Sequence, residues 1–388
     1  MQTRTNPVHE LSQKFLALFG AEARFVQAPG RVNLIGEHTD YNDGFVLPAA
    51  IQFQTTVAIA PRSDQSLTLL SENYAEQVEF SLEKLPAGPR QHWSDYVIGV
   101  AHQLEDLGVR LPGANLLIRG DVPQGSGLSS SASLEAAVCQ AFLEVAQRTM
   151  GMTEIAKLCQ RAENNFVGAH CGIMDQFASL HGRAGQLMKL DCRSLEFEYI
   201  PFDFPEYKLI LVNSMVSHAL AGTEYNIRRL QCEEGVAILQ KHFPQARSLR
   251  DFTLAQIDEY DYELPDLVYR RCAFIIKENQ RLLKGCALLS NKDLHRFGQL
   301  MYETHEGLSH EYEVSCKELD FLTASAKTFD GVVGARMMGG GFGGCSINIV
   351  KSSAEEAFTN YIKAAYEQEF DKTPEVYSTQ IQDGAKIC

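Results

Sequence analysis

Two hydrophobic periods alternate along the first half of the chain. Apolar residues at every second position predict strands at 24–28, 52–60, 66–71, 77–81, 114–120, 186–191 and 197–201. Short polar segments separate the runs at 52–60, 66–71 and 77–81, so we expect three antiparallel strands joined by turns. Apolar residues spaced three and four apart predict helices at 8–19, 93–107, 129–148 and 153–167. This half therefore mixes sheet and helix, with a polar, glycine-rich loop expected at 29–44.

The second half begins after PFDFPEY at 201–207, whose two prolines make it the best candidate for an interdomain linker. A strand at 208–213 precedes long helical patterns at 223–243, 265–289 and 291–328. The last part predicts a strand at 331–338, a glycine loop at 339–344, a strand at 345–350, a helix at 354–370 and a strand at 375–380. The whole pattern is α+β in two unequal parts, and we expect domains at 1–205 and 206–388.

Composition narrows the class of protein. The 388 residues are 45% hydrophobic and 22% charged, which is typical of a folded globular protein. A net charge of −14 argues against nucleic acid or an anionic membrane as a partner, so any anionic ligand must be held by local groups. The N-terminus has no secretory-signal pattern, and no apolar run approaches the ~20 residues that span a bilayer. The ten cysteines include no C-x-x-C pair, so we expect reduced core thiols in the cytoplasm rather than disulfides or a zinc site.

The stretch DVPQGSGLSSSAS, starting at residue 121, joins a predicted strand to a predicted helix through a glycine-containing turn. Gly125 and Gly127 allow positive φ angles and a close approach of a ligand to the backbone. A helix beginning near Ser129 would present unpaired N–H groups and a partly positive end to phosphate, and the hydroxyls at 129–131 suit phosphate or Mg²⁺. The alternative is that these serines only cap a helix after a flexible turn. The chain has no P-loop motif and no D-F-G or H-R-D protein-kinase signature.

A second glycine cluster, GGGFGG at 339–344, formally contains G-x-G-x-x-G. The apolar, strand-like run CSINIV follows it where a dinucleotide-binding motif would have a helix, so that interpretation fails. Two interpretations stay open: a plain hairpin turn, or a loop whose backbone packs against a ligand or against the first glycine loop.

Polar side chains also gather in APGRVNLIGEHTDYNDG at 28–44, where Glu37, His38, Thr39 and Asp40 are consecutive. A polyhydroxylated ligand needs many donors and acceptors, because each buried hydroxyl must find a partner. A merely solvated loop, or a metal site made by Glu37, His38 and Asp40, are the alternatives. Farther along, Asp175 interrupts an apolar run, where it would either cap a short helix or act as a partly buried general base.

These motifs together resemble the galactokinases of the GHMP small-molecule kinase superfamily. GRVNLIGEHTDYNDG is similar to the galactokinase signature, VPQGSGLSSSAS to the superfamily's phosphate loop, and MGGGFGGC to its third motif. They occur in the expected order and cover almost the whole chain; only the first is specific to galactokinases and their close relatives. The resemblance implies two domains with the active site in the cleft between them. The N-terminal domain would be like ribosomal protein S5 domain 2, and the C-terminal domain ferredoxin-like.

The resemblance also implies an activity, the ATP-dependent phosphorylation of galactose at its C1 hydroxyl, and a role for each motif. Asp175 would take the proton of that hydroxyl, with Arg31 keeping the carboxylate ionised and offsetting charge on the transferring phosphoryl group. The groups expected to bind the sugar are Glu37, His38, Thr39, Asp40, Gly172 and Tyr225. Those expected to bind the phosphates are Gly125, Ser126, Gly127, Leu128, Ser129, Ser130 and Ser131. Mg²⁺ would be held by Ser131 and Glu163.

Two alternatives use the same scaffold: a kinase for N-acetylgalactosamine, and a galactose-sensing regulator that binds sugar and ATP without turnover. The presence of Asp175, Arg31 and the Ser131-Ala132 pair favours the enzyme. Trp93, the only tryptophan, would either line an adenine pocket or pack in the core. The expected partners are the small molecules galactose and ATP, and we expect a monomer.

Overall fold

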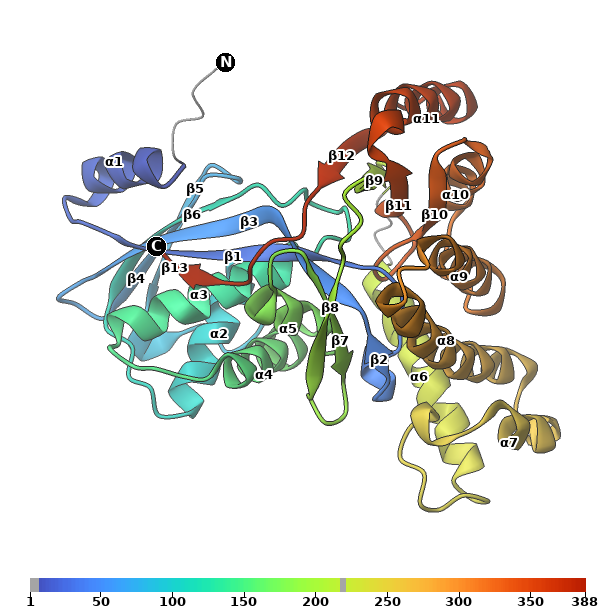
Figure 1. Cartoon of the computed structure of the whole chain (residues 1–388). Helices are drawn as coiled ribbons and strands as arrows, with labels where there is room; N and C mark the ends of the chain where they lie inside the picture. The colour runs from blue at the N-terminus through green and yellow to red at the C-terminus, as the bar shows by residue number, and fades with distance from the viewer. Residues whose placement is uncertain (1–6, 217–220) are drawn as a thin grey trace.

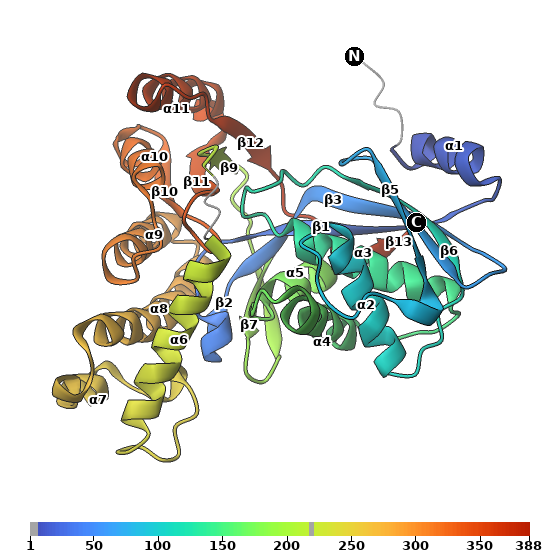
Figure 2. The same ribbon diagram turned by 180° about the vertical axis from the view of Figure 1, so that it is seen from behind.

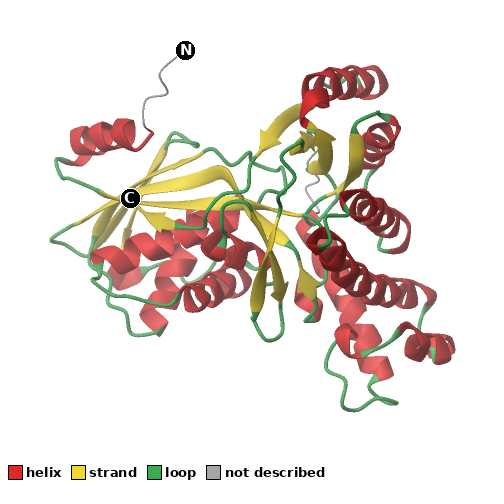
Figure 3. Ribbon diagram, viewed as in Figure 1, coloured by secondary structure: helices red, strands yellow, loops and turns green. Residues whose placement is uncertain are grey.

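The computed structural model describes residues 7–216 and 221–388, which form two parts that each combine sheet and helix (Figure 1). Figure 3 shows the strands of each part with helices packed against them. The first part is built around a six-stranded sheet and the second around a four-stranded sheet. Of the helices in the described ranges, none has the length and hydropathy of a membrane span.

The six-stranded sheet has the order β13-β1-β3-β6-β4-β5. Neighbouring strands are antiparallel except β4 and β6, which are parallel. The expectation of three successive antiparallel strands is therefore corrected: β6 lies between β3 and β4, and only β4 and β5 pair directly. The first five residues of β6 are buried, which suits a central position. The strands are β1 (Arg24–Asn33), β3 (Pro48–Pro61), β4 (Ser66–Ser71), β5 (Glu76–Ser81), β6 (Ala114–Gly120) and β13 (Lys386–Ile387).

β1 is longer than its sequence pattern predicts. The predicted strand ends at 28, but the observed strand continues to Asn33 after a register shift between Pro29 and Arg31. Residues 31–33 pair with 48–50, and every residue from 25 to 33 is buried. Arg31 thus lies in a buried strand rather than in the polar loop expected at 29–44. A buried arginine breaks the apolar alternation, which is why the pattern missed the end of the strand.

Helices cover both faces of this sheet (Figures 1 and 2). Alternate residues of β3 face the two sides: Val57 belongs to the larger core, whereas Ala58 packs in a smaller cluster with Leu11 of α1. On the larger side lie α2 (Ser94–Asp106), α3 (Ser130–Val145), α4 (Met152–Ala162) and α5 (Met174–His181), and on the other lies α1 (Pro7–Phe19). A small sheet of β2 (Phe45–Val46), β7 (Gln186–Asp191) and β8 (Phe197–Pro201) lies beside them.

The second part has a four-stranded antiparallel sheet in the order β10-β11-β9-β12. Its chain order is strand, helices, two strands, helix, strand, which is the ferredoxin-like arrangement expected. The strands are β9 (Tyr207–Asn213), β10 (Val332–Met337), β11 (Cys345–Lys351) and β12 (Glu375–Thr379). The helices are α6 (Ala221–Leu239), α7 (Leu254–Glu259), α8 (Asp266–Ser290), α9 (Leu294–Glu306), α10 (Lys317–Thr328) and α11 (Glu355–Phe370).

Two details of this part differ from the sequence pattern. The single helix expected at 291–328 is divided into α9, a π-helical turn at Gly307–Glu311 and α10. The chain changes direction there so that both helices pack against β10. The short helix α7 has no counterpart among the expected elements, because six residues are too few to show a helical period.

The chain end returns to the first part. β13 pairs with the outer edge of β1, opposite Val26 and Gln27. Just before it, the N–H of Gln382 donates to the Ala50 carbonyl and that of Ala385 to the Ser179 carbonyl, at 2.9 and 2.8 Å. The tail thus packs on residues of the first part, and the domain boundary placed after 205 stays a prediction.

Candidate active site

Arg31 and Asp175 form a two-point ion pair between β1 and the first turn of α5. Arg31 Nε and Nη2 donate to the two carboxylate oxygens of Asp175, each at 2.8 Å. Its remaining nitrogen, Nη1, donates to the carbonyl oxygen of Gly127 at 2.6 Å. Burial opposes the charge of Arg31, but the nearby carboxylates, Asp175 first, outweigh burial and raise the pKa of the guanidinium. Strand, helix and glycine loop are therefore joined at one point.

Ser129 makes a third contact to the same carboxylate. Its Oγ donates to Asp175 Oδ2 at 2.5 Å. Ser129 occupies the N-cap position of α3 with a φ of 61°, yet its side chain makes no capping hydrogen bond. Asp175 lies in the first turn of α5, two residues after the N-cap residue Ile173. Neither residue caps its helix, so the interpretation of both as simple caps does not hold.

The loop before α3 has a backbone suited to an anion. Gly125 and Gly127 have φ angles of 68° and 75°, and the Leu128 carbonyl accepts the N–H of Arg31 at 3.1 Å. A Cβ on Gly30 would lie 2.5 Å from that carbonyl, so the loop lies directly against β1. The N–H groups that open α3 have no partner within their own helix, and the helix dipole makes this end partly positive. Ser126 is buried and its Oγ donates to the Pro123 carbonyl, so its side chain closes the turn.

The second glycine cluster packs against this loop, which decides between its two interpretations. The N–H of Cys345 donates to the Ser126 carbonyl at 3.1 Å. A Cβ on Gly344 would lie 3.0 Å from that same oxygen, and a Cβ on Gly339 would lie 3.3 Å from the Gly127 carbonyl. The glycines therefore allow two backbone segments from different parts of the fold to lie in contact.

A cavity of about 100 Å³ opens beside the ion pair. Five of the six residues expected to hold the sugar line it. The exception is Thr39, whose buried hydroxyl lies 2.9 and 2.6 Å from the carbonyl oxygens of Gly36 and Phe45 and so fixes the loop. The lining residues are Arg31, Glu37, His38, Asp40, Cys171, Gly172, Met174, Asp175, Tyr225, Gly339 and Gly340.

Glu37 is anchored by a residue that the sequence did not single out. Its Oε1 accepts Arg336 Nη2 at 3.0 Å and the N–H of Gly339 at 2.9 Å. Arg336 lies in β10, is completely buried, and also donates to the carbonyl of Leu34 at 2.8 Å. A lone arginine in an otherwise apolar strand pattern is the signal that could have identified it, because a buried cation needs a partner.

His38 is held as a neutral imidazole. Its Nδ1 lies 2.7 Å from the Tyr41 hydroxyl, which lies 2.8 Å from the Tyr312 hydroxyl. Burial, followed by the positive charge of Arg228, lowers the pKa of His38 to about 3. Its Nε2 is buried and makes no hydrogen bond of normal geometry in the part of the chain that the structure describes, although the Gly340 backbone favours the charged ring. The ring thus lies at the wall of the cavity as a neutral group.

Asp40 is the third carboxylate that lines the cavity, beside Glu37 and Asp175. Burial, and then the negative charge of Asp175, raise the pKa of its carboxyl to about 7. Asp40 also packs on Gly172, where an added Cβ would lie 1.9 Å from Asp40 Oδ2. Gly172 thus leaves room for the carboxylate, in addition to any contact of its own with a ligand.

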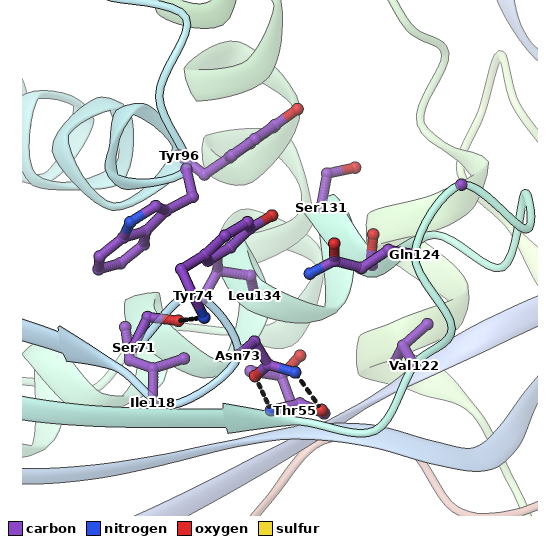
Figure 4. A pocket seen from close by; sticks show the side chains of 14 residues that line it. Thr55, Ser71, Asn73, Tyr74, Tyr96, Ile118, Val122, Gln124, Ser131 and Leu134 are labelled. Carbon is purple, nitrogen blue, oxygen red and sulfur yellow. Dashed lines mark hydrogen bonds between the residues drawn. The ribbon is translucent and has the colours of Figure 1, made fainter. Parts of the chain in front are cut away.

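A second, larger cavity of about 300 Å³ lies at the other side of the glycine loop and is lined by Gly125, Ser130 and Ser131. Figure 4 shows the rings of Tyr74 and Tyr96 in this cavity, with Gln124 and Ser131 at its opposite end. Trp93 also lines it, and its ring is parallel to that of Tyr74 with the centroids 6.0 Å apart. Trp93 is 8% exposed, so it packs in the core and also lines this cavity, and its contact with adenine stays a prediction.

Ser131 and Glu163, the residues expected to hold Mg²⁺, lie near each other, and the Ser131 hydroxyl favours the charged form of Glu163. Burial and the charge of Asp175 raise the pKa of Glu163 to about 7. Gln176 Nε2 donates to Glu163 at 2.6 Å and lies 3.2 Å from Glu135, a fully buried carboxyl that the sequence did not single out. No three His, Cys, Asp or Glu side chains within residues 7–216 and 221–388 are placed to hold a metal ion by themselves.

Comparisons with known proteins match the chain to one family. The galactokinase galactose-binding signature matches residues 13–61, and the N-terminal and C-terminal domains of the GHMP kinases match 95–183 and 286–368. The galactokinase of Roseiflexus sp. (strain RS-1) is 40% identical to this chain, over 97% of this chain and 96% of its own length. The galactokinase of Clostridium acetobutylicum is also 40% identical, over 98% of each chain.

Solved structures give the same result. The structure of Lactococcus lactis galactokinase complexed with galactose is similar with a TM-score of 0.95 and 33% identity, over 99% of this chain and 100% of that one. Methanococcus jannaschii mevalonate kinase shares the fold, with a TM-score of 0.66 at 17% identity over 94% of this chain and 99% of that one. The chain is an enzyme with the two-domain GHMP kinase fold, and it belongs to the galactokinase family.

Proposed function

We propose that the protein transfers the γ-phosphoryl group of ATP to the C1 hydroxyl of α-D-galactose, giving α-D-galactose 1-phosphate and ADP. The observation that carries the proposal is the Arg31–Asp175 pair, which lies between the small cavity and the start of α3. A carboxylate there reaches a hydroxyl in the small cavity, and phosphates at the start of α3 lie beside the same guanidinium.

In this mechanism Asp175 acts as the general base that accepts the proton of the C1 hydroxyl. Arg31 fixes both oxygens of that carboxylate and presents positive charge next to the transferring phosphoryl group. Ser129 holds Oδ2, which leaves less freedom for the carboxylate to turn away. Phosphoryl transfer depends mainly on positioning and charge stabilisation, and these three groups supply both.

The sugar would be held by groups lining the small cavity. Glu37 and Asp40 accept its hydroxyls, and His38 Nε2 offers a buried nitrogen. Tyr225 and the backbone at Gly172 complete the walls. Thr39 would contribute indirectly, because its hydroxyl fixes the loop that carries Glu37, His38 and Asp40. The loop 125–131 and the N–H groups of α3 would hold the phosphates. The larger cavity, which has Tyr74 and Trp93 on its wall, would hold the adenine.

Ser131 and Glu163 fit Mg²⁺, because both offer oxygen atoms and a cation would offset the negative charge that burial disfavours on Glu163. When bound, Mg²⁺ would neutralise charge on the phosphates. The protein's own contribution is to hold Glu163 toward this position through Gln176. We further propose that the protein is cytoplasmic, since all ten cysteines are unpaired thiols and six of them are buried. We also propose that it is a monomer.

Transfer of label from γ-labelled ATP tests the activity directly. Galactose, N-acetylgalactosamine, glucose and arabinose are compared by kcat/KM in a coupled assay. Galactose is expected to be the best substrate, because the cavity is small and closely lined. A higher kcat/KM for N-acetylgalactosamine would show that the cavity accepts a larger C2 substituent, and absence of label transfer would refute the kinase proposal.

A further inference from the structure

The loop at residues 36–45 carries Glu37, His38 and Asp40 and leads into β2, which lies beside α8 of the second part (Figures 1 and 2). Before β2 it contains one 3-10 turn, Asp40–Asn42. A segment with so few backbone pairs of its own keeps one shape only if other parts of the fold hold it. The contacts of this loop with α8 therefore help to decide where the three side chains lie in the small cavity.

Glu278 of α8 holds the first end of this loop. Its Oε1 accepts the N–H of Gly36, the residue directly before Glu37, at 2.8 Å. A Cβ on Gly36 would lie 2.5 Å from Cδ1 of Leu282, which follows Glu278 by one turn in α8. Gly36 thus lies directly against the helix, and its N–H finds its acceptor on a side chain of that helix.

Asn279, the next residue of α8, holds the second end. Its Oδ1 accepts the N–H of Phe45 at 2.9 Å, and its Nδ2 donates to the Ile275 carbonyl of the same helix at 3.1 Å. Both functions of the amide are used, which fixes its orientation. The Thr39 hydroxyl lies between the carbonyl oxygens of Gly36 and Phe45, so the two ends are also joined to each other.

Glu278 is itself held by two groups. Its side chain is fully buried, and Arg281, three residues later in α8, donates to Oε2. The hydroxyl of Thr304 in α9 lies 3.2 and 3.0 Å from the two carboxylate oxygens. A buried carboxylate needs such partners, because burial without them costs free energy. An ion pair that only joined these groups would need no further contact, yet here Oε1 is directed at the N–H beside Glu37.

We propose that Glu278 is a positioning residue for galactose, which acts through the N–H of Gly36 to place Glu37 in the small cavity. The inference rests on the function proposed above. The peptide unit between Gly36 and Glu37 is rigid, so a shift of the Gly36 backbone displaces Glu37. Both oxygens of Glu278 accept, whereas an amide has one acceptor oxygen and cannot serve both Gly36 and Arg281. Glu278→Gln therefore loosens the loop while the size of the side chain stays the same.

The first test measures the loop in the sugar-free, full-length protein by backbone hydrogen exchange and mass spectrometry. The segment 36–45 is expected to exchange at least about fivefold faster in Glu278→Gln, because the loss of a hydrogen bond makes local opening easier. Val268→Ala is the matched control. Val268 is 3% exposed and lies ten residues earlier in α8, so this variant destabilises the helix without touching the loop. Exchange at the wild-type rate in Glu278→Gln, or equally fast exchange in both variants, would overturn the proposal.

The second test measures the dissociation constant for galactose by calorimetry in the absence of nucleotide. Glu278→Gln is expected to raise it about tenfold, as the loss of one hydrogen bond to a charged group implies, and Val268→Ala to leave it unchanged. In a Glu37→Gln background the contact that Glu278 positions is already weakened, so the same substitution should raise the constant less than about threefold. A tenfold rise in both backgrounds, or no rise in the wild-type background, would contradict a role of Glu278 through Glu37.

Two further measurements separate positioning from a loss of folding. Glu278 lies outside the larger cavity, so the KM for ATP in Glu278→Gln should stay within about twofold of the wild type, whereas a poorly folded protein would lose both ligands. Thr304→Val keeps the carboxylate of Glu278 and removes one of its donors, so it should raise the dissociation constant for galactose by a smaller factor, roughly threefold. In case Glu278→Gln does not fold, an unchanged constant in Thr304→Val would overturn the proposal. Absence of galactose binding and of label transfer in the wild type would instead refute the proposed function, and the exchange rates would still show whether Glu278 holds the loop.

Discussion

The affinity for galactose is expected to depend on pH through Asp40. Burial, and then the charge of Asp175, raise the pKa of this carboxyl to about 7 in the sugar-free protein. The ionised form is the better acceptor for sugar hydroxyls, and only this form lacks a proton that competes for the same oxygens. Binding should therefore strengthen as the pH rises through 7.

The size of the effect follows from the titration of one group. With a pKa near 7, about one-tenth of Asp40 is ionised at pH 6 and about nine-tenths at pH 8. The dissociation constant for galactose should thus fall about tenfold between these two pH values. Asp40→Asn keeps a carbonyl acceptor but cannot titrate, so its dissociation constant should be nearly constant over this range.

The pH dependence of the stability of the sugar-free protein gives an independent check. Stability should fall as the pH rises, whereas the affinity for galactose should increase. The folded protein holds the Asp40 proton more tightly than the unfolded chain, where an aspartate titrates near the ordinary 3.8. Stability is therefore lost as the pH rises from about 4 through 7. Asp40→Asn removes this loss and should raise the free energy of unfolding at pH 8 by roughly 2 kcal/mol, a value discounted because the side chain is partly exposed to water.

Calorimetric titration of the nucleotide-free protein with galactose, from pH 6 to pH 8, measures the dissociation constant directly. Asp175→Asn removes the second-largest cause of the raised pKa of Asp40, so the midpoint of the pH dependence should move down by about one unit. A wild-type dissociation constant that does not change from pH 6 to pH 8 would refute the reasoning. An unchanged midpoint in Asp175→Asn would refute the part assigned to Asp175.

Three further predictions concern single features of the fold. Asp175→Asn should lower kcat at least ~100-fold in a γ-label transfer assay and change the dissociation constant for galactose at pH 8 less than about threefold; full turnover would remove Asp175 from the mechanism. Gly172→Ala, whose Cβ would lie 1.9 Å from Asp40 Oδ2, should raise the KM for galactose at least about tenfold. Gly88→Ala, with open space around it, should not, and equal effects in both would contradict the steric argument. Deletion of residues 381–388 removes β13 and the backbone bonds before it, and should lower the free energy of unfolding by roughly 3 kcal/mol in thermal denaturation; an unchanged Tm would show that the tail contributes no stability.

Local pattern was sufficient for most elements of the fold. The predicted strands at 66–71, 114–120, 186–191 and 197–201 coincide with β4, β6, β7 and β8, because each is a short run rich in apolar residues between polar segments. Pairing was not predictable in the same way. β6 separates β3 from β4, and a period of two says nothing about which strand becomes the neighbour.

The candidate site shows the same division between local and long-range information. The positions of Arg31 and Asp175 are far apart in sequence, and only the family resemblance suggested that they meet; the roles assigned to them stay predictions. Arg336 escaped notice because it stands in an apolar strand pattern, just before the third motif, where no ligand role was expected. Glu135 escaped because a glutamate in a helix ordinarily faces water, whereas this one is fully buried beside Gln176. Long-range partners decide both cases, and composition and spacing do not record them.

The return of the tail to β1 has a consequence for synthesis of the protein. β1 is among the first strands to leave the ribosome, but the strand that covers its outer edge contains residues 386 and 387 of a 388-residue chain. That edge stays unpaired until residues 386 and 387 have been made, and until then it is an open template on which another nascent chain can add a strand. Completion of the first-made sheet thus waits for this late segment to dock on β1.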